Sequence, residues 1–372
     1  MYYTDDTLMP ENMDPLIICA APYGPSWLPG DAPDLPVSFE AQTQSAVDCY
    51  NAGATMLHLH VRDPNTGHGS VDMNDFSEML GRLRKAVPKM ILSVGGSISF
   101  APKGPGQTAK WLGYDTRHML AELEPKPDQV TVQVGTSSFN VTELLTPEDY
   151  AGTSFEQPGM LAAYAELTVT STPSFYVEHL KRLRHSKIQP YFMNCHIHQL
   201  ETVERLIRAG LYMGPLNHCL MAVGGGCAGR NPFDLMEYIR RSPHGSVFTM
   251  MSNMRSMFSL TGMAIALGAH ARCGIEENLW SPKKGQRMST VKQVEWQVQL
   301  AKQLGRRVAT AEEARQIFKI GTWYNSVEET LSNLGLPPNR KGGQVGFIVK
   351  ETDGKLYEPG VEPGGYTHAS II

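Results

Sequence analysis

The hydrophobic positions of this chain fall into short apolar runs, separated by longer segments in which apolar and polar residues recur with a helical period. Short continuous apolar runs are typical of parallel strands that are buried on both faces. The pattern predicts eight such strands, at residues 16–20, 55–61, 90–94, 129–134, 190–195, 216–223, 246–251 and 269–273.

Most of the segments between these strands have the pattern of amphipathic helices. An example is FEAQTQSAVDCYNAG, residues 39–53, which ends on Gly53, and glycine commonly terminates helices. Eight strand–helix units in 372 residues favour a (β/α)8 TIM barrel, an α/β fold, over an open doubly wound sheet. We expect residues 15–320 to form this catalytic barrel. Residues 321–372, rich in glycine and proline, are expected to form a C-terminal extension packed on the barrel or on a neighbouring subunit.

Two segments do not fit the alternation of strands and helices. They are residues 97–113, after the third predicted strand, and residues 137–160, after the fourth. Because the C-terminal ends of barrel strands meet at one face, we expect both insertions to lie on the catalytic face, as lids or oligomer contacts.

Two histidines near the end of the second predicted strand are the first candidate for chemistry. His58 and His60 lie two residues apart, so their side chains point to the same face of the strand. Such a pair is half of a metal site, although two hydrogen-bonded core histidines would give the same pattern.

An acidic pair after the eighth strand could complete that site. Glu276 and Glu277 follow this strand and lie close in sequence to Arg272. In a closed barrel the eighth strand is separated from the second only by the first, so a carboxylate here can reach a metal held by His58 and His60. Two imidazoles and one carboxylate leave coordination positions open, as a catalytic metal requires. A solvated ion pair of the arginine with the glutamates is the alternative.

The composition excludes several classes of function. The chain has 41% hydrophobic and 19% charged residues and a net charge of −4 without a basic stripe, which argues against nucleic-acid and membrane partners. The acidic start of the chain has only a short apolar run, so a cytoplasmic location is expected. The six cysteines show no CxxC spacing, which favours reduced thiols over disulfides or a thiolate metal site.

Four motifs carry a family resemblance. They are HLHVRDPNTG (58–67), LSVGG (92–96), VQVGTSSFN (132–140) and ALGAHARCGIEENLW (266–280). From about residue 15 to residue 320 the chain resembles the β-keto acid cleavage enzymes, which include the 3-keto-5-aminohexanoate cleavage enzymes. This resemblance implies a (β/α)8 barrel with a metal, zinc (Zn2+) or another divalent transition metal, bound by His58, His60 and Glu276.

The resemblance also implies roles for other residues. Arg272 matches the arginine of the family, and Glu277 stands where the family usually has aspartate, so these two are the expected catalytic pair. Ser93, followed by Gly95 and Gly96, and Thr131 match positions that bind the substrate carboxylate. Ser93 and Thr131 could instead be core hydroxyls with satisfied hydrogen bonds.

The implied reaction condenses a β-keto acid with acetyl-CoA and gives acetoacetate and a new acyl-CoA. The enzyme would then be a metal-dependent acyltransferase and a homo-oligomer, a dimer or a tetramer. A metal-dependent hydrolase of a lactone or an amide is the alternative, because the same ligands can activate water. A non-catalytic scaffold would not need the histidines and the acid–arginine cluster on one rim.

The sequence also bears on the substrate. Family members that act on amino-substituted keto acids resemble one another in having extra carboxylates near the first and fifth strands, and neither strand has an acid here. A β-keto acid without a positive charge is therefore expected, with its tail contacted by Tyr23, Tyr191 or Asn194.

Two further motifs allow more than one interpretation. His196 and His198 form a second HxH pair, expected to be structural or to line the substrate site, since no acidic partner is evident. The glycine-rich residues 223–234 could offer amides to a thioester, a carboxylate or a CoA phosphate, or could simply form a tight barrel loop.

Overall fold

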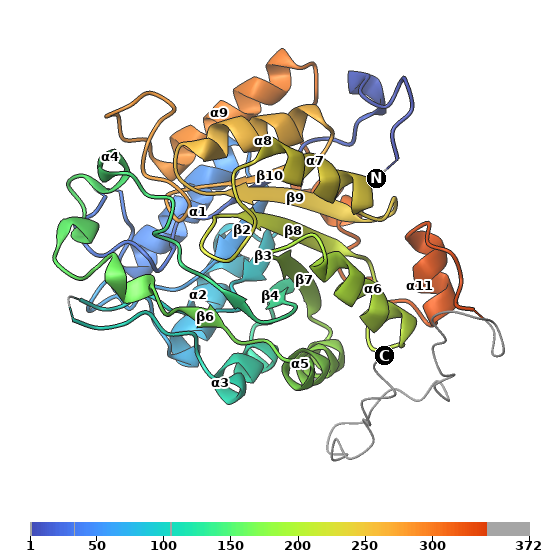
Figure 1. Ribbon diagram of the computed structural model, residues 1–372, viewed down its shortest axis with the longest axis horizontal. Coiled ribbons are helices and arrows are strands. Elements are labelled where there is room, and N and C mark those ends of the chain that lie inside the picture. The colour runs from blue at the N-terminus through green and yellow to red at the C-terminus, as the bar shows by residue number, and fades with distance from the viewer. Residues whose placement is uncertain (1, 33, 105, 341–372) are drawn as a thin grey trace.

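The computed structural model describes residues 2–32, 34–104 and 106–340, and its centre is a closed barrel of parallel strands in the order β1-β10-β9-β8-β7-β4-β3-β2 (Figure 1). This is a (β/α)8 TIM barrel, and all eight predicted strands are confirmed. The barrel strands are β1 (Ile18–Ala20), β2 (Met56–Leu59), β3 (Ile91–Val94), β4 (Gln129–Gln133), β7 (Gln189–Asn194), β8 (Asn217–Ala222), β9 (Val247–Ser252) and β10 (His270–Cys273).

Helices surround the strands on the outside of the barrel (Figure 1). The predicted helix after β1 is α1 (Phe39–Ala52): the Ser38 side chain caps its first turn, and Gly53, with a φ of 119°, ends it in the left-handed conformation. The other helices are α2 (Met73–Ala86), α3 (Tyr114–His118), α4 (Pro147–Tyr150), α5 (Pro173–Ser186), α6 (Gln199–Arg208), α7 (Pro232–Arg241), α8 (Ser256–Ala266), α9 (Thr290–Gln303), α10 (Ala311–Ile317) and α11 (Val327–Asn333), with 3₁₀ turns at Pro10–Asn12, Met119–Glu122, Ser154–Glu156 and Ala162–Tyr164. Among the described residues, no helix is long and apolar enough to cross a membrane.

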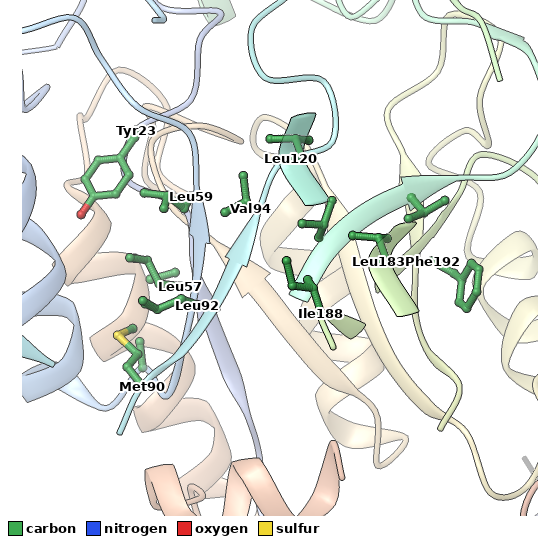
Figure 2. Packing of buried hydrophobic residues seen from close by; sticks show 14 of the residues in the cluster. Tyr23, Leu57, Leu59, Met90, Leu92, Val94, Leu120, Leu183, Ile188 and Phe192 are labelled. Carbon is green, nitrogen blue, oxygen red and sulfur yellow. The ribbon is translucent and has the colours of Figure 1, made fainter. Parts of the chain in front are cut away.

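The alternation of side chains along the strands separates the core from the site. In Figure 2, Leu57 and Leu59 of β2 lie level with Leu92 and Val94 of β3, as the strand register requires, and all four are buried in the hydrophobic cluster that includes the inner faces of α1 and α2. The residues between them, which include His58, must therefore face the barrel interior. Burial of the leucines thus fixes the direction in which the histidines point.

Both insertions cover the C-terminal ends of the strands, as predicted. The second insertion begins with β5 (Ser137–Ser138), which pairs with β6 (Thr168–Val169). Its residue Ser154 donates to the buried Asp31 carboxylate in the loop after β1, and Asp149 pairs with Arg255 beyond β9 at 3.2 Å. The insertions are therefore fastened across the mouth of the barrel and form part of the site described below.

The expected C-terminal extension lies partly outside the described residues. Of residues 321–372, the structure describes those up to 340, which contain α11. Leu331 and Leu334 are buried in the core, and Arg208 of α6 donates to the Pro337 carbonyl at 3.0 Å. The described part of this segment therefore packs on the barrel, and residues 341–372 are not described.

Candidate active site

Three potential metal ligands converge at the mouth of the barrel. Nε2 of His58 and Nε2 of His60 lie 3.5 and 3.6 Å from Oε1 of Glu276, and the donor atoms of the three side chains lie within 4.8 Å of one another. The Glu276 Oε2 atom is buried and has no hydrogen-bond partner among the described residues. The structure therefore brings together the three residues that the sequence predicted as ligands.

Burial and hydrogen bonding favour the neutral form of both imidazoles. Burial holds the pKa of His58 well below its usual range and lowers the pKa of His60 to about 4, and Arg272 acts in the same direction. Nδ1 of His60 lies 2.7 Å from the Ile98 carbonyl oxygen, so it carries the proton and leaves the Nε2 lone pair facing Glu276. Neutral imidazole with a fixed tautomer is the form that binds metals.

Two glycines let the backbone approach these side chains. A Cβ atom at Gly95 would overlap the His60 imidazole and would lie 3.1 Å from Nε2 of His58. A Cβ atom at Gly24 would overlap the Glu276 side chain. The predicted residue Gly95 therefore lies at the site, and its structural effect is to leave room for the imidazole pair.

Arg272 binds both glutamates. Its Nε donates to Oε1 of Glu277 at 2.5 Å, and its Nη2 donates to Oε1 of Glu276 at 2.6 Å. The side chains of Arg272 and Glu277 are each 3% exposed, so this is a buried ion pair and not the solvated pair considered above. The turn at Gly274, whose φ is 143°, brings the two ends of the pair together.

The same burial affects the acid–base properties of the pair. Burial raises the pKa of Glu277 to about 7, although Arg272 opposes this shift. Burial would lower the pKa of Arg272, but Glu277 and Glu276 outweigh it and raise that pKa. A carboxylate whose pKa lies near neutrality is suited to accept and return a proton.

The two predicted hydroxyl groups have no hydrogen-bond partner among the described residues. Ser93 pairs in register with His58, and the Oγ of Ser93 and Oγ1 of Thr131 are both buried without a hydrogen-bond partner in the described structure. Thr131 lines the cavity together with Gly96, where a Cβ atom would overlap the Thr131 carbonyl oxygen. Within the described residues neither hydroxyl is satisfied by another protein group, and Thr131 lines the cavity whereas Ser93 lies buried behind that lining.

A single cavity joins these groups. It contains about 730 Å³ of empty space, counting the part open to solvent at the mouth. Its polar lining consists of Ser26, His58, His60, Ser97, Thr131, Asn253, Arg272, Glu276 and Glu277. Its apolar lining consists of Trp27, Phe100, Trp111, Phe139, Val141, Leu145, Phe155, Met193, Met221, Val223, Met251 and Met254. A small, largely apolar chamber with a polar cluster is the usual form of a site for a small molecule.

Comparison with protein families identifies the group to which this barrel belongs. The family model described as beta-keto acid cleavage enzyme matches residues 15–320. The chain belongs to the beta-keto acid cleavage enzyme family. The sequence prediction of the family is confirmed.

Individual members of this family match the sequence of this chain over most of their length. The chain is 27% identical over 314 residues to the 3-keto-5-aminohexanoate cleavage enzyme of Acetoanaerobium sticklandii, covering 83% of this chain and 99% of that protein. It is 23% identical over 296 residues to the 3-dehydrocarnitine:acetyl-CoA trimethylamine transferase of Rhizobium meliloti, covering 77% and 90% of the two chains. The apo structure of ObcA superposes with a TM-score of 0.57 at 16% identity, over 78% of this chain and 66% of that one, which shows a shared fold.

The three residues that the sequence analysis proposed as contacts of the substrate tail lie outside the lining of the cavity. The Tyr23 hydroxyl donates to the Gln42 carbonyl in the layer between barrel and helices. Asn194 donates to the Tyr238 hydroxyl at 2.8 Å on the helix side of β7, and Tyr191 is buried next to Phe318. Asn194 was wrongly assigned because an uninterrupted apolar strand does not reveal which alternate residues face inward, whereas Tyr191 shares the inward face of Met193 but lies two residues deeper in the barrel.

The other two motifs have structural surroundings. The rings of His196 and His198 stack at 5.1 Å after β7, away from the cavity lining. In the glycine-rich loop the amide of Gly225 donates to the Glu143 carboxylate of the second insertion, and only Val223 lines the cavity. This amide therefore serves to hold the insertion in place.

Sequence reasoning missed the role of Arg62 and of the methionines. Arg62, within HLHVRDPNTG, is fully buried and donates to the carbonyls of Gly24, Trp27 and Gly67, which positions the loop after β1 beside Glu276. An arginine next to an apolar strand could have signalled such a buried role. No sequence pattern distinguished the cavity methionines from the core methionines.

Proposed function

We propose that this member of the family is a metal-dependent β-keto acid:acetyl-CoA acyltransferase that forms acetoacetate and a new acyl-CoA. The observation that carries the proposal is the convergence of His58, His60 and Glu276 beside the buried pair of Arg272 and Glu277. Relatives named as acetyl-CoA-dependent transferases support the cosubstrate.

The three ligand residues fit a zinc-like ion. Two neutral imidazoles and a carboxylate with an unpartnered oxygen offer the nitrogen and oxygen donors that zinc binds. Three ligands leave at least one coordination position of the ion open. When bound, the ion would supply Lewis-acid polarisation of the keto carbonyl. The Ile98 carbonyl would orient His60, and Nη2 of Arg272 would hold Glu276 through Oε1, the same oxygen that faces the histidines.

The remaining polar residues would bind substrate and move a proton. Glu277 is the proposed base, and Arg272 orients its carboxylate through the Nε contact. Ser93 and Thr131 would donate to the substrate carboxylate, which would satisfy their orphaned hydroxyls. Gly96 would keep the backbone close to Thr131 at that position.

Two further expectations belong to the proposal and rest on the sequence. The protein would act in the cytoplasm, and it would be a homo-oligomer, a dimer or a tetramer. Cell fractionation and sedimentation of the purified protein test them.

Incubation of the purified protein with β-keto acids and acetyl-CoA tests the activity. We expect acetoacetate to form in a reaction that requires both substrates. Lactone or amide hydrolysis without acetyl-CoA would instead support the alternative, a hydrolase that uses the same ligands. Metal analysis of the His58→Ala/His60→Ala variant is the control: a stoichiometric ion retained by this variant would exclude the proposed ligands.

A further inference from the structure

The polar and apolar residues of the cavity lie on opposite sides of the barrel. His58, His60, Arg272 and Glu276 come from β2 and from β10 with the turn that follows it. In the closed strand order β8 is as far from β2 as a strand can be, and β7 and β9 flank it. A substrate whose keto group lies at the histidines must therefore extend its tail towards β7, β8 and β9.

Methionine side chains cover that opposite side. They are Met193 of β7, Met221 of β8, Met251 of β9 and Met254 just beyond β9, and we call these four residues the methionine wall. Each is at most 8% exposed. Unbranched, polarisable methionine side chains adapt to apolar groups of different shape.

Aromatic side chains from the loops after β1, β3 and β4 also line the chamber. Phe100 and Trp111 of the first insertion stack with ring centroids 5.7 Å apart, and Phe139 of the second meets Trp111 edge-on at 5.8 Å. Phe155 packs edge-on against Trp27 at 5.2 Å. The cavity is therefore apolar both at the methionine wall and along these loops.

No charged side chain of the described cavity lining faces a tail at this end. Glu276 and Glu277 line the polar end, where both bind Arg272. Asn253 is the polar residue near the wall, and its Oδ1 accepts from Arg230 at 3.1 Å. A cationic or anionic tail would lose its hydration at this end without gaining a partner.

We propose that the methionine wall selects β-keto acids with an uncharged, apolar tail. This inference rests on the proposed function, because that function places a keto acid in the cavity. Each methylene buried against the wall increases affinity by about fourfold. The competing occupant of the wall is the pantetheine arm of acetyl-CoA.

Binding of simple carboxylates tests the wall without any turnover. We expect calorimetry to show that octanoate binds about fifteenfold more tightly than hexanoate, which is two methylenes shorter. The chain-matched 6-aminohexanoate and adipate should bind at least tenfold more weakly than hexanoate. Equal or tighter binding of either charged ligand would overturn the inference.

Two wall variants locate the effect. Met221→Ala removes a wall side chain, and Met251→Gln keeps the volume but introduces a polar group. Each should weaken octanoate binding by about tenfold and have a smaller effect on propionate. Met250→Ala is the matched control, because Met250 neighbours Met251 on β9 but packs in the cluster that faces α7 and α8, and it should leave binding unchanged. Equal losses in Met250→Ala and Met251→Gln would contradict the inference.

Kinetics separate this inference from the proposed function. With acetyl-CoA, kcat/KM should be highest for 3-oxooctanoate, then 3-oxohexanoate, and lowest for 5-amino-3-oxohexanoate and 3-oxoadipate. Absence of acetoacetate with every substrate would reject the proposed function, and the carboxylate affinities would still decide the role of the wall. A uniform rise in the KM for acetyl-CoA in the wall variants, the same with every keto acid, would assign the wall to the pantetheine arm and overturn the inference.

Discussion

At the scale of single residues, the site depends on how two adjacent glutamates divide their roles. Glu276 lies within reach of both imidazoles, whereas Glu277 contacts Nε of Arg272. Glu277 is 3% exposed and bound to the arginine. The proposed ligand role of Glu276 and the proposed base role of Glu277 can therefore be separated by mutation.

We predict that Glu277→Gln retains the metal but slows the chemical step by about a hundredfold or more, the usual effect of losing a general base. Glutamine has nearly the same shape and cannot accept the proton. Metal content and single-turnover rates, measured on the same preparation, test this prediction.

Arg272→Lys provides the companion variant. It keeps the charge but cannot donate to Glu276 and Glu277 from one planar group, so it should also be slow. Loss of metal in Glu277→Gln would mean that the two glutamates have exchanged roles, and near wild-type turnover would remove Glu277 from the mechanism.

At the scale of elements, the junction after β3 controls the shape of the site. We predict that Gly95→Ala leaves the barrel folded but weakens metal binding by at least tenfold, because the added methyl group would displace the His60 ring. Metal titration and thermal unfolding of this variant separate the two effects.

Gly81→Ala on α2 is the matched control for the change at Gly95. A Cβ atom at Gly81 meets no other atom, so this variant should bind metal normally and stabilise the helix by about 1 kcal/mol. Normal metal binding by Gly95→Ala would show that the imidazoles do not need this glycine.

The opposite end of the strands is held by an ion-pair network. Asp128, immediately before β4, accepts from the Leu92 amide, from Arg84 of α2 and from Arg315 of α10. Burial would raise the pKa of Asp128, but the two arginines and the amide outweigh burial and lower it. A carboxyl group whose pKa is lower in the folded state stabilises the fold above its unfolded pKa of about 3.9, and this stability is lost as the pH falls through the folded pKa.

We predict that Asp128→Asn lowers the free energy of unfolding by about 2 kcal/mol at neutral pH. The difference from wild type should shrink below about pH 4, because the wild-type carboxyl group then becomes protonated. Urea unfolding at several pH values tests this, with the exposed Asp5→Asn as the control. A difference that does not change with pH would contradict the assignment.

At the scale of the whole molecule, the proposed metal joins parts of the chain that are far apart in sequence. His58 lies on β2, His60 follows it directly, and Glu276 follows β10, with β1 between these two strands. A bound ion would therefore stabilise the closed barrel across three strands.

We predict that removal of the metal with a chelator lowers the melting temperature and that zinc restores it. At a free metal concentration one hundred times Kd, binding should stabilise the folded state by about 2.7 kcal/mol. This corresponds to a rise in melting temperature on the order of 5 °C. The His58→Ala/His60→Ala variant should show no response to either treatment. An equal zinc response in this variant would place the stabilising ion elsewhere.

The sequence alone determined the barrel, the family and the convergence of His58, His60 and Glu276. Eight apolar runs identified the strands because parallel strands are buried on both faces. The spacing of His58 and His60 fixed their common face, and the order of strands in a closed barrel brought Glu276 near them.

Only the tertiary structure decided which side chains line the cavity. Burial on both faces makes the inward and outward residues of a strand look alike, so Asn194 was wrongly assigned to the cavity while its neighbour Met193 lines it. Contacts between distant segments also decide the conformation of the two insertions and the burial of Arg62. They likewise decide that Ser93 and Thr131 find no hydrogen-bond partner among the described residues. Such contacts leave no local pattern, because a hydrogen bond or a packed ring depends on where the folded chain returns and not on which residues are adjacent along it.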